Sequence, residues 1–248
     1  MDPISIVAAS GLRARMESLD LLANNLANAA TSGYKNDHEF YTLFTHESAD
    51  PGLLQVPSTQ PLIDRNWTDF SQGLLEPTKS PLDVGLAGKG LITVTGPSGP
   101  LYTRNGGFRV SPAGQLVTAE GYLLPGDAIG TPITVDPALP IDITVDGTVQ
   151  QAGQPVGQLQ IVEFANTSGL TKQANNYFRN VAPNTTKPQP SADTEVRQGA
   201  LEASNVKPPE SAVHLIGIMR QFEMLQKAIS IAGEMNRLAV DQVAKVGG

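Results

Sequence analysis

The side chains that most often catalyse reactions or bind metals are few and scattered in this chain. His38, His46 and His214 are the three histidines, and no two of them have the spacing of metal ligands. There is no cysteine, which excludes disulfides, thiolate zinc sites and cysteine nucleophiles. His214 falls in a predicted helix, where a histidine is more often a surface or interface residue than a catalytic base.

Two segments match ligand-binding loops only in part. Asp142 and Asp146 match the first ligand positions of a calcium loop, but Gly153 stands where the bidentate glutamate should be. A β-hairpin turn is therefore expected here. Residues 85–90 contain the glycines and lysine of a phosphate loop, but Gly90 stands where Ser or Thr would hold magnesium. With no nucleophile elbow either, we expect no catalytic residue, no metal site, no cofactor and no small-molecule substrate.

The composition is that of a folded chain with many turns. Of the 248 residues, 40% are hydrophobic and 17% are charged, with 24 glycines and 19 prolines. The formal net charge of −7 argues against sequence-independent binding of nucleic acids, which requires a basic face. Asp2 and Glu17 flank a start without a continuous apolar run, so no cleaved signal peptide is expected.

Both ends of the chain predict a helix with one apolar stripe. Asp2-Pro3 favours a helix start, and Gly33 favours a left-handed stop about 28 residues later. The first stripe has coiled-coil-like 4-3-4-3-4 spacing and consists of Leu12, Met16, Leu19, Ala23, Leu26 and Ala30. The second follows Pro208-Pro209-Glu210 at 3-4-3-4-3 spacing and consists of Leu215, Ile218, Phe222, Leu225, Ile229 and Ala232. Because neither stripe stabilises an isolated helix, the two helices should pair.

Two further features of these helices favour contact with more than one neighbour. A second apolar line, formed by Ile216, Met219 and Met235, widens the face of the C-terminal helix. Gly217 and Gly233 lie in its interior, where glycine costs roughly 1 kcal/mol against alanine, and close approach of another helix would explain them.

The residues between the helices predict β-structure. Residues 36–72 contain three prolines and are interpreted as an extended linker or arm. From residue 73 the apolar period changes to two, with turn signals such as Asn105-Gly106-Gly107 and Asp146-Gly147. We therefore predict a mixed α+β fold, in which an antiparallel sandwich or barrel-like domain (73–204) is inserted into a terminal helical domain (1–35 with 205–248).

Several motifs, in order along the chain, carry a family resemblance. Residues 24–28 read Asn-Asn-Leu-Ala-Asn and residues 31–35 read Thr-Ser-Gly-Tyr-Lys. Residues 102–106 read Tyr-Thr-Arg-Asn-Gly, and residues 199–206 read Gly-Ala-Leu-Glu-Ala-Ser-Asn-Val. With Pro81–Val84 and Gly114–Val117, these motifs resemble those of the bacterial flagellar rod and hook proteins over nearly the whole chain.

The resemblance implies a structural function. It implies that the terminal helices form an inner axial domain, that the subunit leaves the cell through the flagellar type III export apparatus, and that it polymerises with itself and other rod or hook axial proteins. The product would be the rod, the drive shaft that crosses the periplasm and transmits torque from motor to hook. The residues expected at the assembly interface are Leu12, Met16, Leu19, Leu22, Asn24, Asn25, Leu26, Asn28, Leu201, Asn205, Leu215, Ile218, Phe222, Leu225 and Ile229.

Within this family, the chain is short for a hook protein. Arg220–Met224, with Phe222 where the distal rod subunit usually has Tyr, resembles the proximal rod subunit. Leu91-Ile92 departs from the aromatic pair of many relatives, so the distal rod subunit stays as the second hypothesis. The alternative from another class is an exported adhesin or carbohydrate-binding β-module with oligomerising helical ends, which should have a groove lined with aromatic residues.

Overall fold

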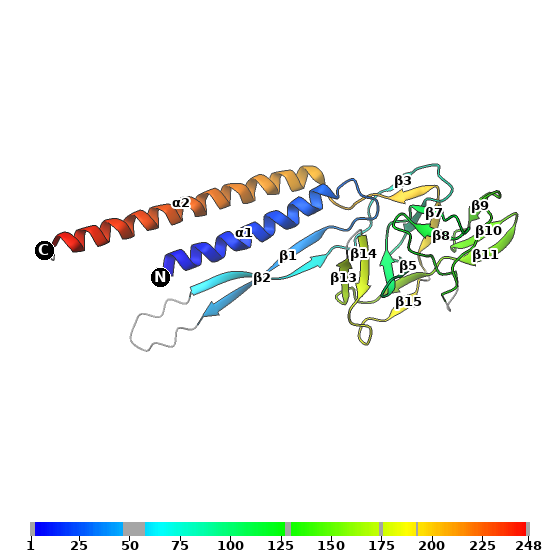
Figure 1. Ribbon diagram of the computed structural model, residues 1–248, viewed down its shortest axis with the longest axis horizontal. Coiled ribbons are helices and arrows are strands. Elements are labelled where there is room, and N and C mark those ends of the chain that lie inside the picture. The colour runs from blue at the N-terminus through cyan, green and yellow to red at the C-terminus, as the bar shows by residue number, and fades with distance from the viewer. Residues whose placement is uncertain (1–2, 47–57, 127–129, 174–175, 192, 247–248) are drawn as a thin grey trace. The chain divides into compact units, whose positions relative to one another are not determined.

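The chain forms two compact units. The computed structural model describes residues 3–46, 58–126, 130–173, 176–191 and 193–246 (Figure 1). Unit 1 consists of Met1–Ala27, Asp37–Trp67 and Lys207–Gly248, and unit 2 consists of Asn28–Asn36 and Thr68–Val206. The sequence prediction places residues 28–35 in the helical domain, whereas by its contacts this segment lies in unit 2.

Two α-helices and seventeen strands make up the described chain. In order they are α1 Pro3–Ala27, β1 Asp37–His46, β2 Ser58–Thr68, β3 Leu75–Pro77, β4 Val84–Ala87, β5 Leu91–Gly96, β6 Gly99–Thr103, β7 Phe108–Val110, β8 Leu116–Thr118, β9 Ile141–Ile143, β10 Thr148–Gln151, β11 Gln154–Gln158, β12 Ile161–Phe164, β13 Leu170–Gln173, β14 Tyr177–Asn180, β15 Pro188–Pro190, β16 Glu195–Gln198, β17 Ala200–Glu202 and α2 Pro208–Val246.

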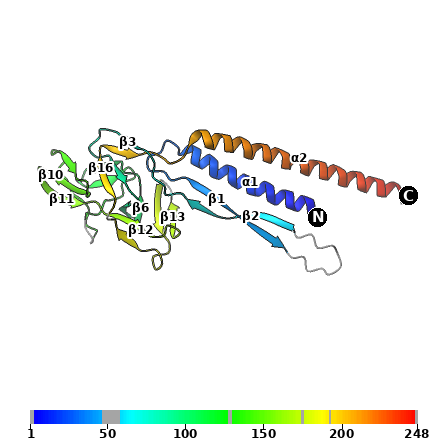
Figure 2. The same ribbon diagram turned by 180° about the vertical axis from the view of Figure 1, so that it is seen from behind.

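In unit 1, α1 and α2 run antiparallel beside a two-stranded sheet of β1 and β2 (Figures 1 and 2). The helix α2 begins at Pro208, as its proline pair predicts, whereas α1 ends at Ala27, three residues before the end of its predicted stripe. Gly33 has the expected positive φ of 70°, but it belongs to the turn after the helix and does not cap it.

The predicted arm is more regular than its prolines indicate. Strands β1 and β2 form a two-stranded sheet, and Pro61 lies inside β2. A strand in a two-stranded sheet has one open edge, where a residue without an N–H group breaks no ladder hydrogen bond. The connection between the strands, residues 47–57, lies outside the described residues.

Unit 2 is built from small antiparallel sheets around one larger sheet. The larger sheet has six strands in the order β13-β14-β6-β5-β12-β15, and β11-β10-β9 form a second sheet of three. Strands β16 with β4, β17 with β3, and β7 with β8 form pairs. The strand pairings are antiparallel, and over the described residues every sheet has two open edges, so none closes into a barrel.

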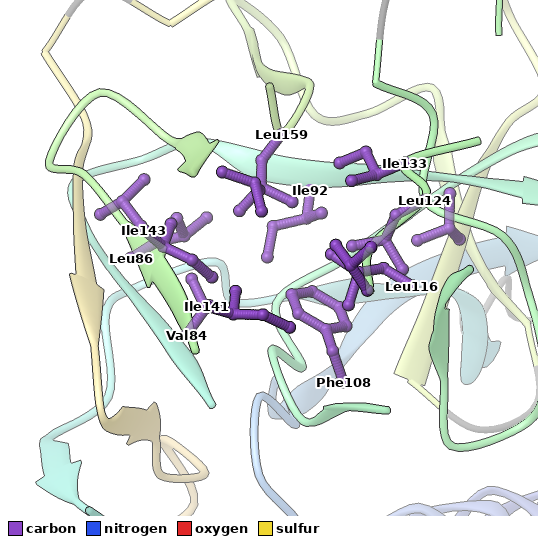
Figure 3. Packing of buried hydrophobic residues seen from close by; sticks show 14 of the residues in the cluster. Val84, Leu86, Ile92, Phe108, Leu116, Leu124, Ile133, Ile141, Ile143 and Leu159 are labelled. Atoms are coloured by element: carbon purple, nitrogen blue, oxygen red, sulfur yellow. The ribbon is translucent and has the colours of Figure 1, made fainter. Parts of the chain in front are cut away.

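Alternating side chains place apolar residues on both faces of the six-stranded sheet. Leu91 belongs to one buried cluster and Ile92 to another, because successive residues of a strand point to opposite faces. The larger cluster is the main core and includes Val84, Leu86, Ile92, Phe108, Leu116, Leu124, Ile133, Ile141, Ile143 and Leu159 (Figure 3). The fold is thus mixed α+β, and in chain order a β-rich antiparallel unit separates two terminal helices, as predicted.

One predicted turn has a different function. The sequence predicts that Asn105-Gly106-Gly107 joins two strands as a hairpin, but β6 pairs with β5 and β14, and β7 pairs with β8. Gly106 instead lies against β4, where the Val84 amide donates to its carbonyl at 3.0 Å. A Cβ atom on Gly106 would fall 1.8 Å from the Val84 carbonyl oxygen, so glycine is required here for close backbone approach. The Asp146-Gly147 hairpin between β9 and β10 forms as expected.

Candidate functional site

The C-terminal stripe is the side of α2 that is covered within the chain. Ile218 is 3% exposed, and Leu215, Phe222, Leu225 and Ile229 are partly buried. Leu225 lies across from α1, because a Cβ atom on Gly11 would be 3.6 Å from its side chain. The structure therefore brings these five predicted interface residues onto one face, and that face packs inside the subunit.

The covered side of α1 is rotated from the predicted stripe. The buried residues are Ala14, Ser18, Leu22 and Asn25, whereas Met16 is 54% exposed. Leu12, Leu19 and Leu26 are partly buried between these two sides. The spacing of the leucines did not indicate which side of α1 is covered, because that side includes small and polar residues that bind other polar groups. The Ser18 hydroxyl, for example, bonds to the Ala14 carbonyl at 3.0 Å and also to the Glu39 carboxylate.

The predicted asparagines mainly bind the backbone of their own chain. The Asn25 amide donates to the Asp37 carbonyl at 2.7 Å and accepts from the Asp37 N–H at 3.0 Å, which fixes the start of β1 on α1. Asn205 accepts from the Asn36 N–H at 2.7 Å and donates to the Asp69 carbonyl at 2.8 Å. Asn28 accepts from the Thr31 hydroxyl at 3.2 Å. Asn24 is exposed, and Leu201 lies partly buried in β17.

A fully buried ionic network joins three signature motifs within unit 2. The Lys35 ammonium donates to Glu202 Oε1 at 2.6 Å and to the Ser71 carbonyl at 2.5 Å. The Arg104 guanidinium donates to Glu202 Oε2 at 3.0 Å, and the Gly73 N–H donates to Oε1 at 2.8 Å. The exposed fractions of the three charged side chains are at most 1%. Both carboxylate oxygens of Glu202 are therefore paired, as a buried carboxylate requires.

Burial lowers the pKa of both cations in this network. It lowers the pKa of Lys35 below 10.5, although Glu202 opposes the shift by attraction and by its hydrogen bond. Burial likewise lowers the pKa of Arg104. Sequence reasoning missed this network, since its members are separated by up to 167 positions. The one signal was that each of the three motifs contains a single charged residue.

Unit 2 also has a surface groove with a volume of about 520 Å³. Its lining includes two aromatic residues, Phe70 and Phe164, together with Leu91 and Lys89. Phe164 is only 7% exposed, so it does not offer a ring face for stacking. Phe70 is partly exposed, so among the described residues the groove offers one partly exposed ring and not the row of exposed aromatic residues expected of a carbohydrate-binding module.

The described residues offer neither a metal cluster nor a membrane span. No group of three His, Asp or Glu side chains among them is close enough to hold a metal ion. Neither described helix combines the length and the hydropathy that crossing a membrane requires.

An apolar surface that the described residues leave uncovered follows the outer side of α2. It consists of Val213 (72% exposed), Ile216, Met219, Met224, Ile231, Met235 and Leu238. At Gly217 and Gly233, no atom lies within 4 Å of the position that a Cβ atom would take, so packing inside the subunit does not explain these glycines. An apolar helix face of this length is typical of a protein interface.

Comparison with known proteins agrees with these features. Residues 7–35 match the family described as flagella basal body rod protein, residues 85–151 match the flagellar hook protein FlgE/F/G D1 domain, and residues 197–241 match the flagellar basal body rod FlgEFG protein C-terminal domain. The chain is 34% identical to the flagellar basal-body rod protein FlgF of Caulobacter vibrioides over 99% of this chain and all of that protein. It is 31% identical to FlgG of Buchnera aphidicola, with 95% and 97% covered, and 33% identical to FlgF of Salmonella typhimurium, with 86% of each covered.

Proposed function

This chain belongs to the family of flagellar basal-body rod proteins, and we propose that the outer face of α2 is the surface through which its copies polymerise into the rod. The chain is a structural subunit of that rod. The observation that supports the proposal is the uncovered apolar face from Val213 to Leu238, which lies on the opposite side of α2 from the stripe packed inside the subunit. Burying such a face contributes about 25 cal/mol per Å² of apolar area.

The mechanical function follows from helices with two contact faces. One face of α2 is held by its own α1, and the other is available to a neighbour, so each subunit can link to the next through continuous helix packing. We propose that this shared packing transmits torque along the rod, because interdigitated helices resist bending and twisting. No catalytic residue, cofactor or small-molecule substrate is part of this mechanism, and we propose that the protein is not an enzyme.

We also propose a position in the rod, the partners and the compartment of the protein. Phe222 within Arg220–Met224 favours the proximal rod, with the distal rod as the second hypothesis. Family membership supports other rod and hook axial proteins as neighbours, export through the flagellar export apparatus without a cleaved signal, and a location that spans the periplasm. The adhesin or carbohydrate-binding alternative is not favoured, since the relatives are rod proteins along the full chain.

The experiment that tests the proposal is polymerisation of the purified full-length chain with Ile231→Asp. Light scattering and electron microscopy should show filaments of the unchanged chain and none of the variant, while circular dichroism shows an unchanged monomer. Gln226→Asp, at an exposed polar position of the same helix, is the matched control and should polymerise normally. Normal filaments from Ile231→Asp would show that the outer face of α2 is not the assembly surface.

A further inference from the structure

The outer sides of the two helices carry complementary patterns. On α2, exposed residues recur with heptad spacing, and this outer α2 row consists of Val213, Gly217, Arg220, Met224, Lys227, Ile231, Glu234 and Leu238. On α1, the exposed residues with the same spacing form an outer α1 row of Ala9, Arg13, Met16, Asp20, Ala23 and Ala27. The α2 row is bulky and the α1 row is rich in alanine, so side chains of one can enter the space that the other leaves.

We propose that the outer α2 row of one subunit packs antiparallel on the outer α1 row of the next, with Lys227 opposite Asp20 and Glu234 opposite Arg13. This inference rests on the proposed function and names the partner of its assembly surface as a second copy of this chain, contacted through a different face. The same register places Ile231 opposite Met16, Met224 opposite Ala23 and Leu238 opposite Ala9. Both charged positions of α1 are then matched by an opposite charge.

Charge selects this register against its neighbours. A shift of one heptad in one direction places Arg13 opposite Lys227, and a shift in the other direction places Asp20 opposite Glu234. Each shift keeps one attractive pair, Asp20 with Arg220 or Arg13 with Asp241, but adds one pair of like charges. The proposed register is therefore the one in which both charges of α1 are matched without repulsion. Charged residues at seam positions set the register of paired helices in this way. The bond of Arg13 to Glu17 does not prevent this, because both side chains are exposed, 84% and 44%, and such pairs are weak.

The contact is also of the kind that an open filament requires. Two different faces meet, so the contact is heterologous and each added subunit presents the same unused face again. The antiparallel direction is the one that α1 and α2 have inside one chain (Figure 1). The register differs, because inside the chain Gly11 lies across from Leu225. In the filament, α2 would lie between its own α1 and the α1 of a neighbour.

Charge reversal in the full-length chain tests the proposed register. Asp20→Lys and Lys227→Glu should each raise the critical concentration for polymerisation by about tenfold or more, and the double variant should restore it to within about twofold. Arg220→Glu is the matched control, because it should not rescue Asp20→Lys unless the helices pair one heptad away. Rescue by Arg220→Glu, or no rescue by Lys227→Glu, would overturn the proposed register.

Disulfide trapping tests which faces meet, and the absence of cysteine from the chain makes every trapped bond unambiguous. Chains with Ala23→Cys and tagged chains with Met224→Cys are mixed, polymerised and oxidised. A disulfide between unlike chains is expected, and neither variant alone should cross-link. Cross-linking of Met224→Cys with itself would indicate a symmetric contact and overturn the inference while leaving the proposed function intact. Failure of the unchanged chain to polymerise would instead count against the proposed function.

Discussion

At the scale of single residues, the buried network of Lys35, Arg104 and Glu202 is the most constrained part of the molecule. One carboxylate balances two cations in a site from which water is excluded. Removing one partner lowers the free energy of unfolding by more than the intact network adds to it, because the remaining charges stay buried without a partner. The three residues come from three signature motifs, so the network explains why segments far apart in sequence are needed together.

Glu202→Gln is therefore expected to lower the free energy of unfolding by about 3–5 kcal/mol, since Lys35 and Arg104 would remain uncompensated. Urea denaturation followed by circular dichroism measures this loss. The matched control is Glu195→Gln, because Glu195 lies 3.7 Å from Arg197 with both side chains 61% exposed. The control should cost less than about 1 kcal/mol. Equal effects of the two substitutions would show that burial of the network does not determine its contribution.

The lowered pKa of Lys35 also predicts a pH dependence. Between that lowered pKa and 10.5, the unfolded state binds more protons at this residue than the folded state, so stability should rise with pH in this window. Comparison of the unchanged chain with Lys35→Met isolates the effect, because the buried tyrosines are common to both. The stability difference should move in favour of the unchanged chain as the pH approaches 10.5. A difference that stays constant with pH would contradict the prediction.

Gly33→Ala tests the turn that leads into the network. Gly33 has a φ of 70°, and a Cβ atom would lie 2.4 Å from the Asn105 nitrogen. Gly153→Ala is the control, because its φ of 77° is similar but nothing lies within 4 Å. Both variants should show the left-handed backbone penalty of about 1 kcal/mol, and Gly33→Ala should cost about 1–3 kcal/mol more. Thermal unfolding of both variants decides whether close packing or backbone conformation fixes this glycine.

At the scale of elements, the helix α2 has two faces with different functions. Its inner face, which includes the buried Ile218 and the partly buried Phe222, is covered within the subunit, and its outer face is left for a neighbour. An interaction within the chain must form before the helix can present its other side in a fixed orientation. Substitutions on the two faces should therefore give different defects.

Phe222→Asp should weaken the pairing of α1 with α2 in the monomer as well as abolish polymerisation, because it places a charge in the inner seam. Circular dichroism should show a loss of helix, while the β-rich unit keeps its thermal transition. Gln221→Asp, one position away and exposed, should leave both helix content and polymerisation unchanged. If the β-rich unit melted together with the helices in Phe222→Asp, the two units would not be energetically separate.

At the scale of the whole molecule, the two units bury very different cores. Unit 2 contains sixteen buried residues in its main hydrophobic cluster alone, whereas the described apolar residues buried in unit 1 are Ala14, Leu22 and Ile218. Local stability follows the density of buried apolar contacts. The monomer should therefore open far more readily in its helical unit, and the filament should stabilise that unit by adding the missing contacts.

Backbone hydrogen exchange on the full-length monomer measures this difference directly. Residues 3–27 and 208–246 should exchange fast, and residues 84–180 should be protected. On polymerisation, protection should increase in the helices and change little in the core of unit 2. Uniform protection in the monomer would mean that the helices are already a finished domain, and it would favour a self-contained module over an assembly-dependent subunit.

The properties that depend on local periodicity and turn chemistry could be predicted from the sequence. The terminal helices, the start of α2, the inner stripe from Leu215 to Ile229, and the β-rich character of the middle all follow from the spacing of apolar residues along one element. The hairpin at Asp146-Gly147 follows from two adjacent residues. The family motifs are local strings of residues as well, and they were enough to indicate the rod function.

Which segments of the chain meet was visible only in the three-dimensional structure. It showed that the side chains of Asn25 and Asn205 bind backbone groups elsewhere in the same chain. It also showed that residues 28–36 belong with the β-rich unit, and that Gly106 lies against Val84 instead of closing a hairpin. Above all it brought Lys35 to Glu202, 167 positions away. Such contacts depend on strand order and on the path of connecting segments, and neither is encoded in the periodicity of any single element.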